Sequence, residues 1–198
     1  MALVSSTLEN TLKGILADMQ DGSKSDAWMG DQIGGAISEY IGTGQVATVD
    51  TGTAPTGSYS GAGMGTMAIS AGTLKSKLTT TFEARYSNED LAAHIAADID
   101  EVCTVADIIK TTTSGMVATP AGPVAFSGAG KGSFTGTPAS IESTLATCFS
   151  AMNSLSQGGD DHLAAQLASA IHAYLTGGSI SVTLQSPFTE GSAEGGLV

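Results

Sequence analysis

The stretch that decides the fold is SGAGMGTM at residues 60–67, which returns as SGAGKGSF at residues 127–134. Five of the eight positions are identical, and the offset between the two copies is 67 residues. The register continues beyond the glycines, where apolar positions repeat as Leu74 and Ile141, Leu78 and Leu145, and Phe82 and Phe149. A fixed period of this kind is the signature of a repeat protein.

Two further segments repeat at about twice this offset. Residues 7–19 align with residues 140–152, and residues 36–46 align with residues 170–180. Val46-Ala-Thr also matches Val117-Ala-Thr, so we expect Val117 to begin the equivalent strand of the middle copy. The sequence therefore predicts three tandem units, over residues 7–72, 73–139 and 140–198.

Each unit carries the pattern of two helices followed by two strands, because apolar residues first recur at steps of three and four and then alternate. Gly44 and Gly178 are placed to end the second helix in left-handed geometry, and hydroxyl residues are placed to cap the first helix, namely Thr7, Thr73 and Ser140. The predicted fold class is α+β, a single domain over residues 1–198 with three helix-helix-strand-strand repeats of about 67 residues. Such units form a ring around a pseudo-threefold axis or a short stacked array.

The third unit runs out at residues 194–198, where its glycine-rich strand is expected. We therefore expect this hairpin to be shortened or irregular in its last strand. A short hairpin leaves the edge of a neighbouring strand unpaired, and a free edge can accept a strand from another subunit. The sequence thus favours assembly through strand pairing.

The charge balance excludes several partners. The 198 residues include nineteen acids and seven bases, which give a net charge of −12, and the few bases are scattered. Nucleic acid and anionic membranes are therefore not expected as partners. No segment has the roughly 18 apolar residues of a membrane span, and the first residues lack the pattern of a secretory signal, so we expect synthesis in the cytoplasm.

The glycine-rich segment at residues 128–133 has a superficial similarity to a phosphate-binding loop. Such a loop needs its lysine directly before serine or threonine at the start of a helix, whereas Gly132 follows Lys131 here. The repeat places Met64 at the position of Lys131 in the first copy and Leu197 in the third. We therefore predict no cofactor and interpret the alternating glycines as room for another backbone or a bulky ring.

Two small groups of residues carry metal-ligating side chains. His94 and Asp98 lie one helical turn apart, and Asp160, Asp161 and His162 are consecutive. Neither group has a third or fourth ligand at a characteristic spacing, and exposed helical residues explain both. The sequence predicts no metal site.

The other residues whose side chains could take part in catalysis or binding are interpreted as structural. Cys103 and Cys148 lie in apolar helical patterns, where a free cysteine behaves as a small hydrophobic residue. Trp28 is interpreted as a packing anchor, and Glu39 and Asp50 flank a strand without a spacing that defines a carboxylate pair. We therefore predict no catalytic residue and no enzyme.

The alternation of helical segments with glycine-rich strands, in an acidic chain with one arginine, resembles virion structural proteins of tailed bacteriophages. The resemblance rests on residues 60–67 and 127–134. In composition and in the alternation of segments it covers most of the chain. It implies a structural component of a phage particle, in the neck, tail or capsid surface, assembled in the host cytoplasm. We expect a homo-oligomer that also contacts other virion proteins through subunit packing and strand pairing.

A surface adhesin or carbohydrate-binding repeat module is the alternative. It would use the loops at residues 51–57 and 120–123 and would need aromatic side chains clustered there. The sequence has only Tyr59 and Phe126 beside these loops.

Overall fold

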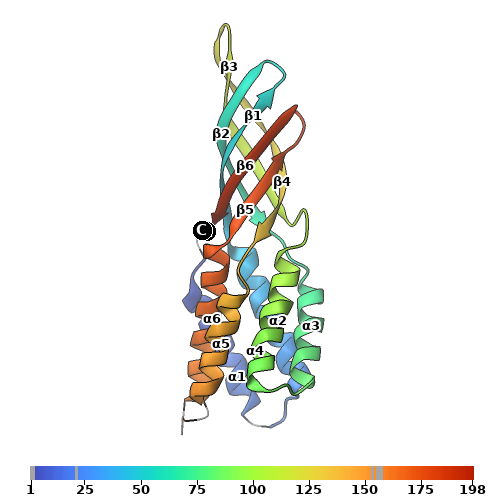
Figure 1. Cartoon of the computed structure of the whole chain (residues 1–198), viewed down its shortest axis with the longest axis vertical. Helices are drawn as coiled ribbons and strands as arrows, with labels where there is room; N and C mark the ends of the chain where they lie inside the picture. The colour runs from blue at the N-terminus through green and yellow to red at the C-terminus, as the bar shows by residue number, and fades with distance from the viewer. Residues whose placement is uncertain (1–2, 21, 153, 155–157) are drawn as a thin grey trace.

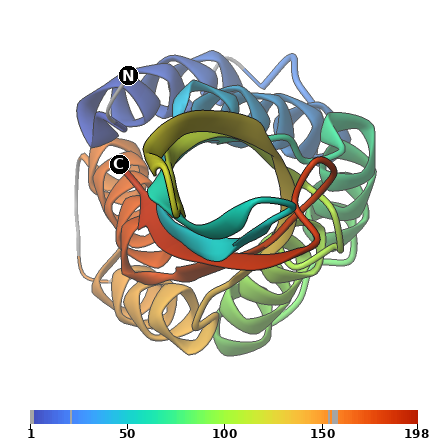
Figure 2. The ribbon, with the colours of Figure 1, turned by 90° about the horizontal axis from the view of Figure 1, so that it is seen from above.

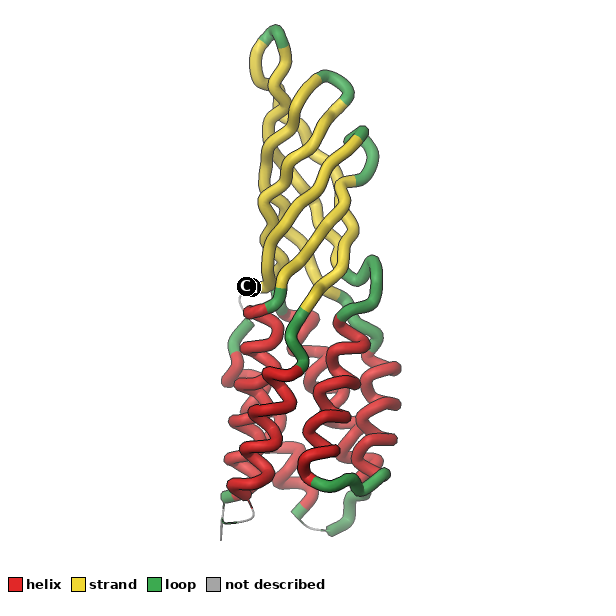
Figure 3. Tube along the Cα trace, in the orientation of Figure 1, coloured by secondary structure: helices red, strands yellow, loops and turns green. Residues whose placement is uncertain are grey.

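The computed structural model describes residues 3–20, 22–152, 154 and 158–198. The molecule is elongated, with its helices at one end and its strands at the other (Figures 1 and 3). The helices are α1 (Ser5–Met19), α2 (Asp26–Thr43), α3 (Ala71–Glu83), α4 (Asn88–Cys103), α5 (Ala139–Met152) and α6 (Gly159–Gly177). The strands are β1 (Gln45–Ala54), β2 (Gly57–Met67), β3 (Ile109–Thr119), β4 (Gly122–Thr135), β5 (Ser179–Leu184) and β6 (Glu190–Leu197). This order confirms three helix-helix-strand-strand units.

The three units close into a ring. The strands form one antiparallel barrel in the order of the chain, and β6 returns to pair with β1 from Val46 opposite Leu197 to Thr53 opposite Glu190. The helices follow the same circular order, with α6 packed against α1. Seen along the long axis, the ring of helices surrounds the axis on which the barrel stands (Figure 2). Of the two arrangements left open by the sequence, the pseudo-threefold ring is the observed one.

The base of the barrel, next to the helices, is closed by one apolar side chain from each strand. All six side chains are buried, namely Val46, Met67, Ile109, Phe134, Ile180 and Leu197. They are paired across the ladders, for example Met67 opposite Ile109 and Phe134 opposite Ile180. The layer consists of two residues from each of the three hairpins, so the core follows the threefold repeat. Its burial removes apolar area from water where the helices meet the barrel.

Tyr174 of α6 connects the helices to the base of the barrel through a ring contact and a hydrogen bond. Its ring packs edge-on against Phe134 with 5.3 Å between ring centroids, and its hydroxyl donates a hydrogen bond of 2.6 Å to Asp100 of α4. A Cβ on Gly136 would collide with both rings, and a Cβ on Gly178 would collide with the ring of Phe134. Burial, together with the hydrogen bond to Asp100, raises the pKa of Tyr174 above its usual value.

The first unit meets the second along a seam of small residues on α2, namely Gly30 and Gly34. The equivalent positions of α4 and α6 are also small and buried, namely Ala92, Ala96, Ala164 and Ala168. At the α2–α3 seam a Cβ on Gly34 would lie 2.8 Å from the Cα of Lys75, so only glycine allows this approach. The absence of side chains there brings two helix backbones into contact.

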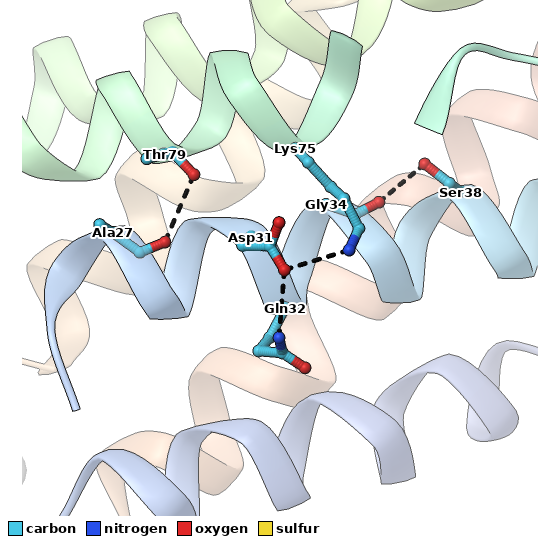
Figure 4. A network of polar contacts seen from close by, with 7 residues as sticks. All are labelled: Ala27, Asp31, Gln32, Gly34, Ser38, Lys75 and Thr79. Carbon is cyan, nitrogen blue, oxygen red and sulfur yellow. Dashed lines mark hydrogen bonds and ion pairs between the residues drawn. The ribbon is translucent and has the colours of Figure 1, made fainter. Parts of the chain in front are cut away.

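Polar contacts border the α2–α3 seam (Figure 4). The Lys75 ammonium lies 3.1 Å from a carboxylate oxygen of Asp31, and the Thr79 hydroxyl donates to the carbonyl of Ala27 at 3.3 Å. Ser38 donates to the carbonyl of Gly34 within α2. The ion pair is half-exposed, so it contributes little free energy compared with the packing of the seam.

The middle strand does not begin where the sequence predicts. β3 starts at Ile109, and Val117 lies near its far end. The pairing register makes Ile109 the counterpart of Val46 and Ile180, because the three residues face Gly132, Gly65 and Gly195. The Val-Ala-Thr match is therefore accidental. The connection from α4 to β3 is longer than the equivalent connections in the other two units.

The predicted helix caps are also corrected. Thr7 and Thr73 lie inside the first turns of α1 and α3, and Ser140 lies inside that of α5. The cap of α3 is Ser70, whose hydroxyl accepts from the amide of Thr73. Gly44 and Gly178 do follow the second helices, but in extended rather than left-handed geometry, because the chain runs directly into a strand.

Candidate functional site at the distal end of the barrel

The three hairpins differ in length at the distal end of the barrel, the end away from the helices. β4 has 14 residues and β2 has 11, whereas β6 has 8 and β5 has 6. The three hairpin tips therefore end at different heights (Figures 1 and 3). The third hairpin has the shortest strands, and its glycine-rich strand, residues 190–197, is present and paired on both sides.

The short third hairpin leaves part of β4 without a neighbour. β4 pairs with β3 from Gly122 to Gly132, but its ladder to β5 stops at Gly130 opposite Leu184. Beyond this point the carbonyl of Ala129 accepts from the amide of Gln185, and no other described strand pairs with this side of β4. Within the described residues the sheet is closed at its base, and residues 122–128 form a free edge at its distal end.

The direction of the backbone groups on this edge follows from the register. Ala129 bonds toward β5, so Ser127 and Ala125, two and four residues away, present their N–H and C=O groups to the same side. Pro123 is the next residue that faces this side. It has no N–H, so it cannot donate a hydrogen bond to an added strand. Ala125 and Ser127 are exposed, so the free edge offers two N–H groups and their carbonyls to an added strand.

Val124 shows that the distal end of the barrel is open on the inside as well. It alternates with Phe126 and Gly128 on the inner face of β4, yet 54% of its surface is exposed. Its partner across the β3 ladder, Val117, is fully buried. An inward-facing valine is exposed here because the β5–β6 hairpin does not reach it.

Just below this opening, three aromatic rings close the barrel. Phe188, from the β5–β6 connection, packs edge-on against Tyr59 at 4.7 Å and against Phe126 at 5.1 Å between ring centroids. Its ring lies over Gly128, where a Cβ would collide with it. The interpretation of the alternating glycines as room for a ring or a backbone is confirmed, since Gly132 likewise lies against the backbone of Ser181.

These aromatic contacts weigh against a carbohydrate-binding site at the loops. Tyr59 is 3% exposed and its hydroxyl is paired with that of Thr113 at 2.6 Å, so it offers no open stacking face. The predicted loops are also shorter than expected, because the turns consist of residues 55–56 and 120–121 between long strands.

The outer surface of the barrel carries little charge. Sixteen of the nineteen acids and five of the seven bases lie outside the strands, so the helical half and its connections have a net charge of −11. The strands carry a net charge of −1. Val49 is 71% exposed on this outer surface, and Met64 and Met116 are also exposed. A near-neutral surface with exposed apolar side chains is better suited to contact than the acidic helical half.

The middle of the barrel contains a buried polar layer. Asp50 is fully buried, and one of its carboxylate oxygens accepts from the Thr48 hydroxyl at 2.6 Å. Its other oxygen and the hydroxyl of Thr111 have no hydrogen-bond partner among the described residues. The counterparts of Asp50 in the other units are Thr113 and Leu184, so this layer is not a repeated site.

The remaining residues singled out in the sequence are dispersed. Lys131 is exposed on the outside of β4, and its structural counterpart in the third unit is Glu194 rather than the predicted Leu197. Glu39 is exposed on α2, whereas Asp50 is fully buried on β1. Trp28 packs against the core from α2 and lies under the ammonium of Lys24, 5.2 Å from the ring centroid.

The histidine groups do not converge on a metal. His94 stacks on Tyr86 with 4.0 Å between centroids, whereas Asp98 accepts from the Thr81 hydroxyl. His162 lies in the first turn of α6 beside Asp160 and Asp161. Within the described ranges, no three histidine, cysteine or carboxylate side chains gather as a metal site would require.

Both cysteines are buried, as the sequence predicts. Burial raises the pKa of the Cys103 thiol to about 12, with a smaller contribution from Asp100 nearby. Burial also raises the pKa of Cys148. A thiol that stays protonated is a poor nucleophile, so neither residue is suited to covalent chemistry.

Two features were missed in the sequence although each leaves a signal there. The seam residues Gly30 and Gly34 stand one helical turn apart, and alanines occupy the equivalent positions of the other units. Residues 190–197, EGSAEGGL, are the third copy of the glycine-rich motif and retain Gly191 and Gly195 at the positions of Gly61 and Gly65.

Comparison with protein-family models, with curated proteins and with solved structures finds no match to this chain. Among the described residues, none of the helices combines the length and the apolar character of a membrane span.

Proposed function

We propose that this protein is a structural building block of a phage particle, in its neck, tail or capsid surface, and that it docks through the distal end of its barrel. The free edge of β4 at residues 122–128 carries this proposal, because it is a strand edge without a partner among the described residues of a sheet that is closed at its base. A strand supplied by another copy or by a neighbouring virion protein would continue the sheet there.

The distribution of repeated and variable residues supports a structural role. Positions that pack are kept in all units, as in the barrel base with Val46, Ile109 and Ile180. Positions that would carry chemistry change from unit to unit, as with Asp50 and its counterparts or Lys131 and its counterparts. A catalyst needs a particular set of side chains, whereas a building block needs a reproducible shape.

The exposed surface of the barrel supports docking at the same end. Val124 on the inner face of the opening and Met116 on the adjacent strand are 54% and 48% exposed. An added strand with an apolar residue opposite Val124 would bury this surface and fill the space that the third hairpin leaves. Backbone hydrogen bonds would then supply affinity, and the Val124 contact would supply selectivity.

The proposal is tested by size-exclusion chromatography with light scattering on the full chain and on Ala125→Pro. Proline removes the Ala125 N–H that faces the free side, and it leaves the β3 ladder intact because the neighbouring even-numbered residues make those bonds. We expect the wild-type chain to self-associate and the proline variant to associate less. Ala125→Val, which keeps the N–H, is the matched control and should associate as the wild type does. A stable wild-type monomer at micromolar concentration contradicts self-assembly through this edge.

A further inference from the structure

The free end of the helical ring contains a cavity of about 170 Å³ lined only by apolar side chains. All three units contribute equivalent residues to its walls. The outer wall consists of Leu16, Phe82 and Phe149 from the first helices and Met29, Leu91 and Leu163 from the second helices. The cavity therefore lies on the pseudo-threefold axis, where three copies of a packing arrangement meet without filling the centre.

The walls show that the cavity opens toward the free end. Its floor includes Leu12 and Leu145, neither of which has any exposed surface. Its outer wall includes Met29, Leu91 and Leu163, which are half-buried and lie near the starts of α2, α4 and α6. These helices lead from the free end up to the barrel (Figure 1). Among the described residues, the site is thus an apolar cup with partly exposed side chains at its mouth.

The volume of the cavity limits the size of the chemical group that fits inside it. An engineered cavity of about 150 Å³ with apolar walls stays dry and binds benzene. A volume of 170 Å³ therefore accommodates one aromatic ring or one branched alkyl group and has no polar group to retain water.

Charge at the same end restricts the occupant further. The first turns of α2, α4 and α6 carry five acids that lie one to three residues before the outer-wall residues, namely Asp26, Glu89, Asp90, Asp160 and Asp161. Lys13 and Arg85 each lie within 4 Å of one of these acids, and Lys24 lies over Trp28 at the start of α2. These three bases offset only part of the charge of the five acids. An apolar group that enters the cup would approach through a negative field.

We propose that the cup holds one large apolar side chain of a partner protein, flanked in that partner by lysine or arginine. This inference rests on the proposed role as a building block and adds a second docking point, at the end opposite the free strand edge. The side chain would fill the cavity, and the flanking cations would face the acids of the three helix starts.

The test uses NMR spectra of the methyl-labelled full chain with three acetylated pentapeptides. The first has phenylalanine between two pairs of lysines, the second has alanine in its place, and the third has phenylalanine between two pairs of glutamates. We expect only the first peptide to shift the methyl signals of Leu91, Leu163 and Ile95. It is added to about 5 mM, where a complex with a dissociation constant of 1 mM is about four-fifths formed.

Two variants make the result specific. Leu91→Trp fills the cup and should abolish the shifts at Leu163, whereas Glu89→Gln with Asp161→Asn keeps the cup and should weaken binding of the first peptide several-fold. No shift with the first peptide, or equal shifts with the alanine peptide, overturns the proposal. Equal shifts with the glutamate peptide overturn the requirement for basic flanks. Ala125→Pro should leave peptide binding unchanged, so failure here is distinguishable from failure of strand-edge assembly.

Discussion

Gly30 of α2 and Thr79 of α3 are in backbone contact, so that a Cβ built on Gly30 would lie 2.6 Å from the Cα of Thr79. The first unit joins the second at this point. Because the obstacle is backbone rather than a flexible side chain, the helices must separate to admit even one methyl group.

Gly30→Ala should therefore lower the free energy of unfolding by about 2 kcal/mol or more, through overpacking of the seam. Gly14→Ala is the control, because Gly14 lies inside α1 with open space around its Cα. This control should raise stability by about 0.5–1 kcal/mol through helix propensity. Urea unfolding followed by circular dichroism measures both variants, and equal effects would contradict the seam.

A second prediction concerns Gly128 and the ring of Phe188 above it. Gly128→Ala would push this ring out of its place and should destabilise the protein by about 1–3 kcal/mol. Phe188→Ala should cost about 3 kcal/mol, because it empties the aromatic cluster. The double variant should be more stable than the sum of the two effects predicts, because the methyl group then has room. Strict additivity in a denaturant double-mutant cycle would show that the two residues do not interact.

Stability should fall at alkaline pH. The pKa of Cys103 is raised to about 12 in the folded chain, and that of Tyr174 is raised as well, so the folded state holds these protons more tightly than the unfolded state. The stabilisation is complete below about pH 9, the ordinary range of a thiol, and is lost as pH rises toward 12. Tyr174 adds to this loss only above about pH 10, the ordinary range of a phenol, and each group should contribute up to about 1 kcal/mol per pH unit.

Cys103→Ala is the matched variant for this effect, because alanine fits the same small apolar site without a proton to lose. Urea unfolding at pH 8 and pH 10.5 should show a smaller loss of stability in this variant than in the wild type. An identical pH dependence would contradict the assignment to Cys103. Native Cys103 should also resist a thiol reagent at pH 8 and react after unfolding.

The sequence predicted the architecture well where packing repeats. The offset between residues 60–67 and 127–134 revealed the period, and the helical spacing of Leu74 and Leu78 revealed the first helix of a unit. It misplaced the middle strand because a short Val-Ala-Thr match outweighed the alternation that begins at Ile109. Local similarity of small residues is a weak guide when the connections between elements differ in length.

The candidate site was predictable only in part. The shortened third hairpin is visible in the chain, but the position of the free edge depends on the pairing of β6 with β1 and on the stop at Leu184. These are long-range contacts that no local pattern encodes. The end cavity is likewise a property of three units meeting on an axis, although each of its lining residues has an ordinary helical spacing.

Electron microscopy of the native assembly tests the central claim most directly. We predict additional strand density beside residues 122–128 of β4, continuing the barrel toward the tip of the longest hairpin. An assembly in which this edge faces solvent, and in which neighbours contact the chain only elsewhere, would contradict the account.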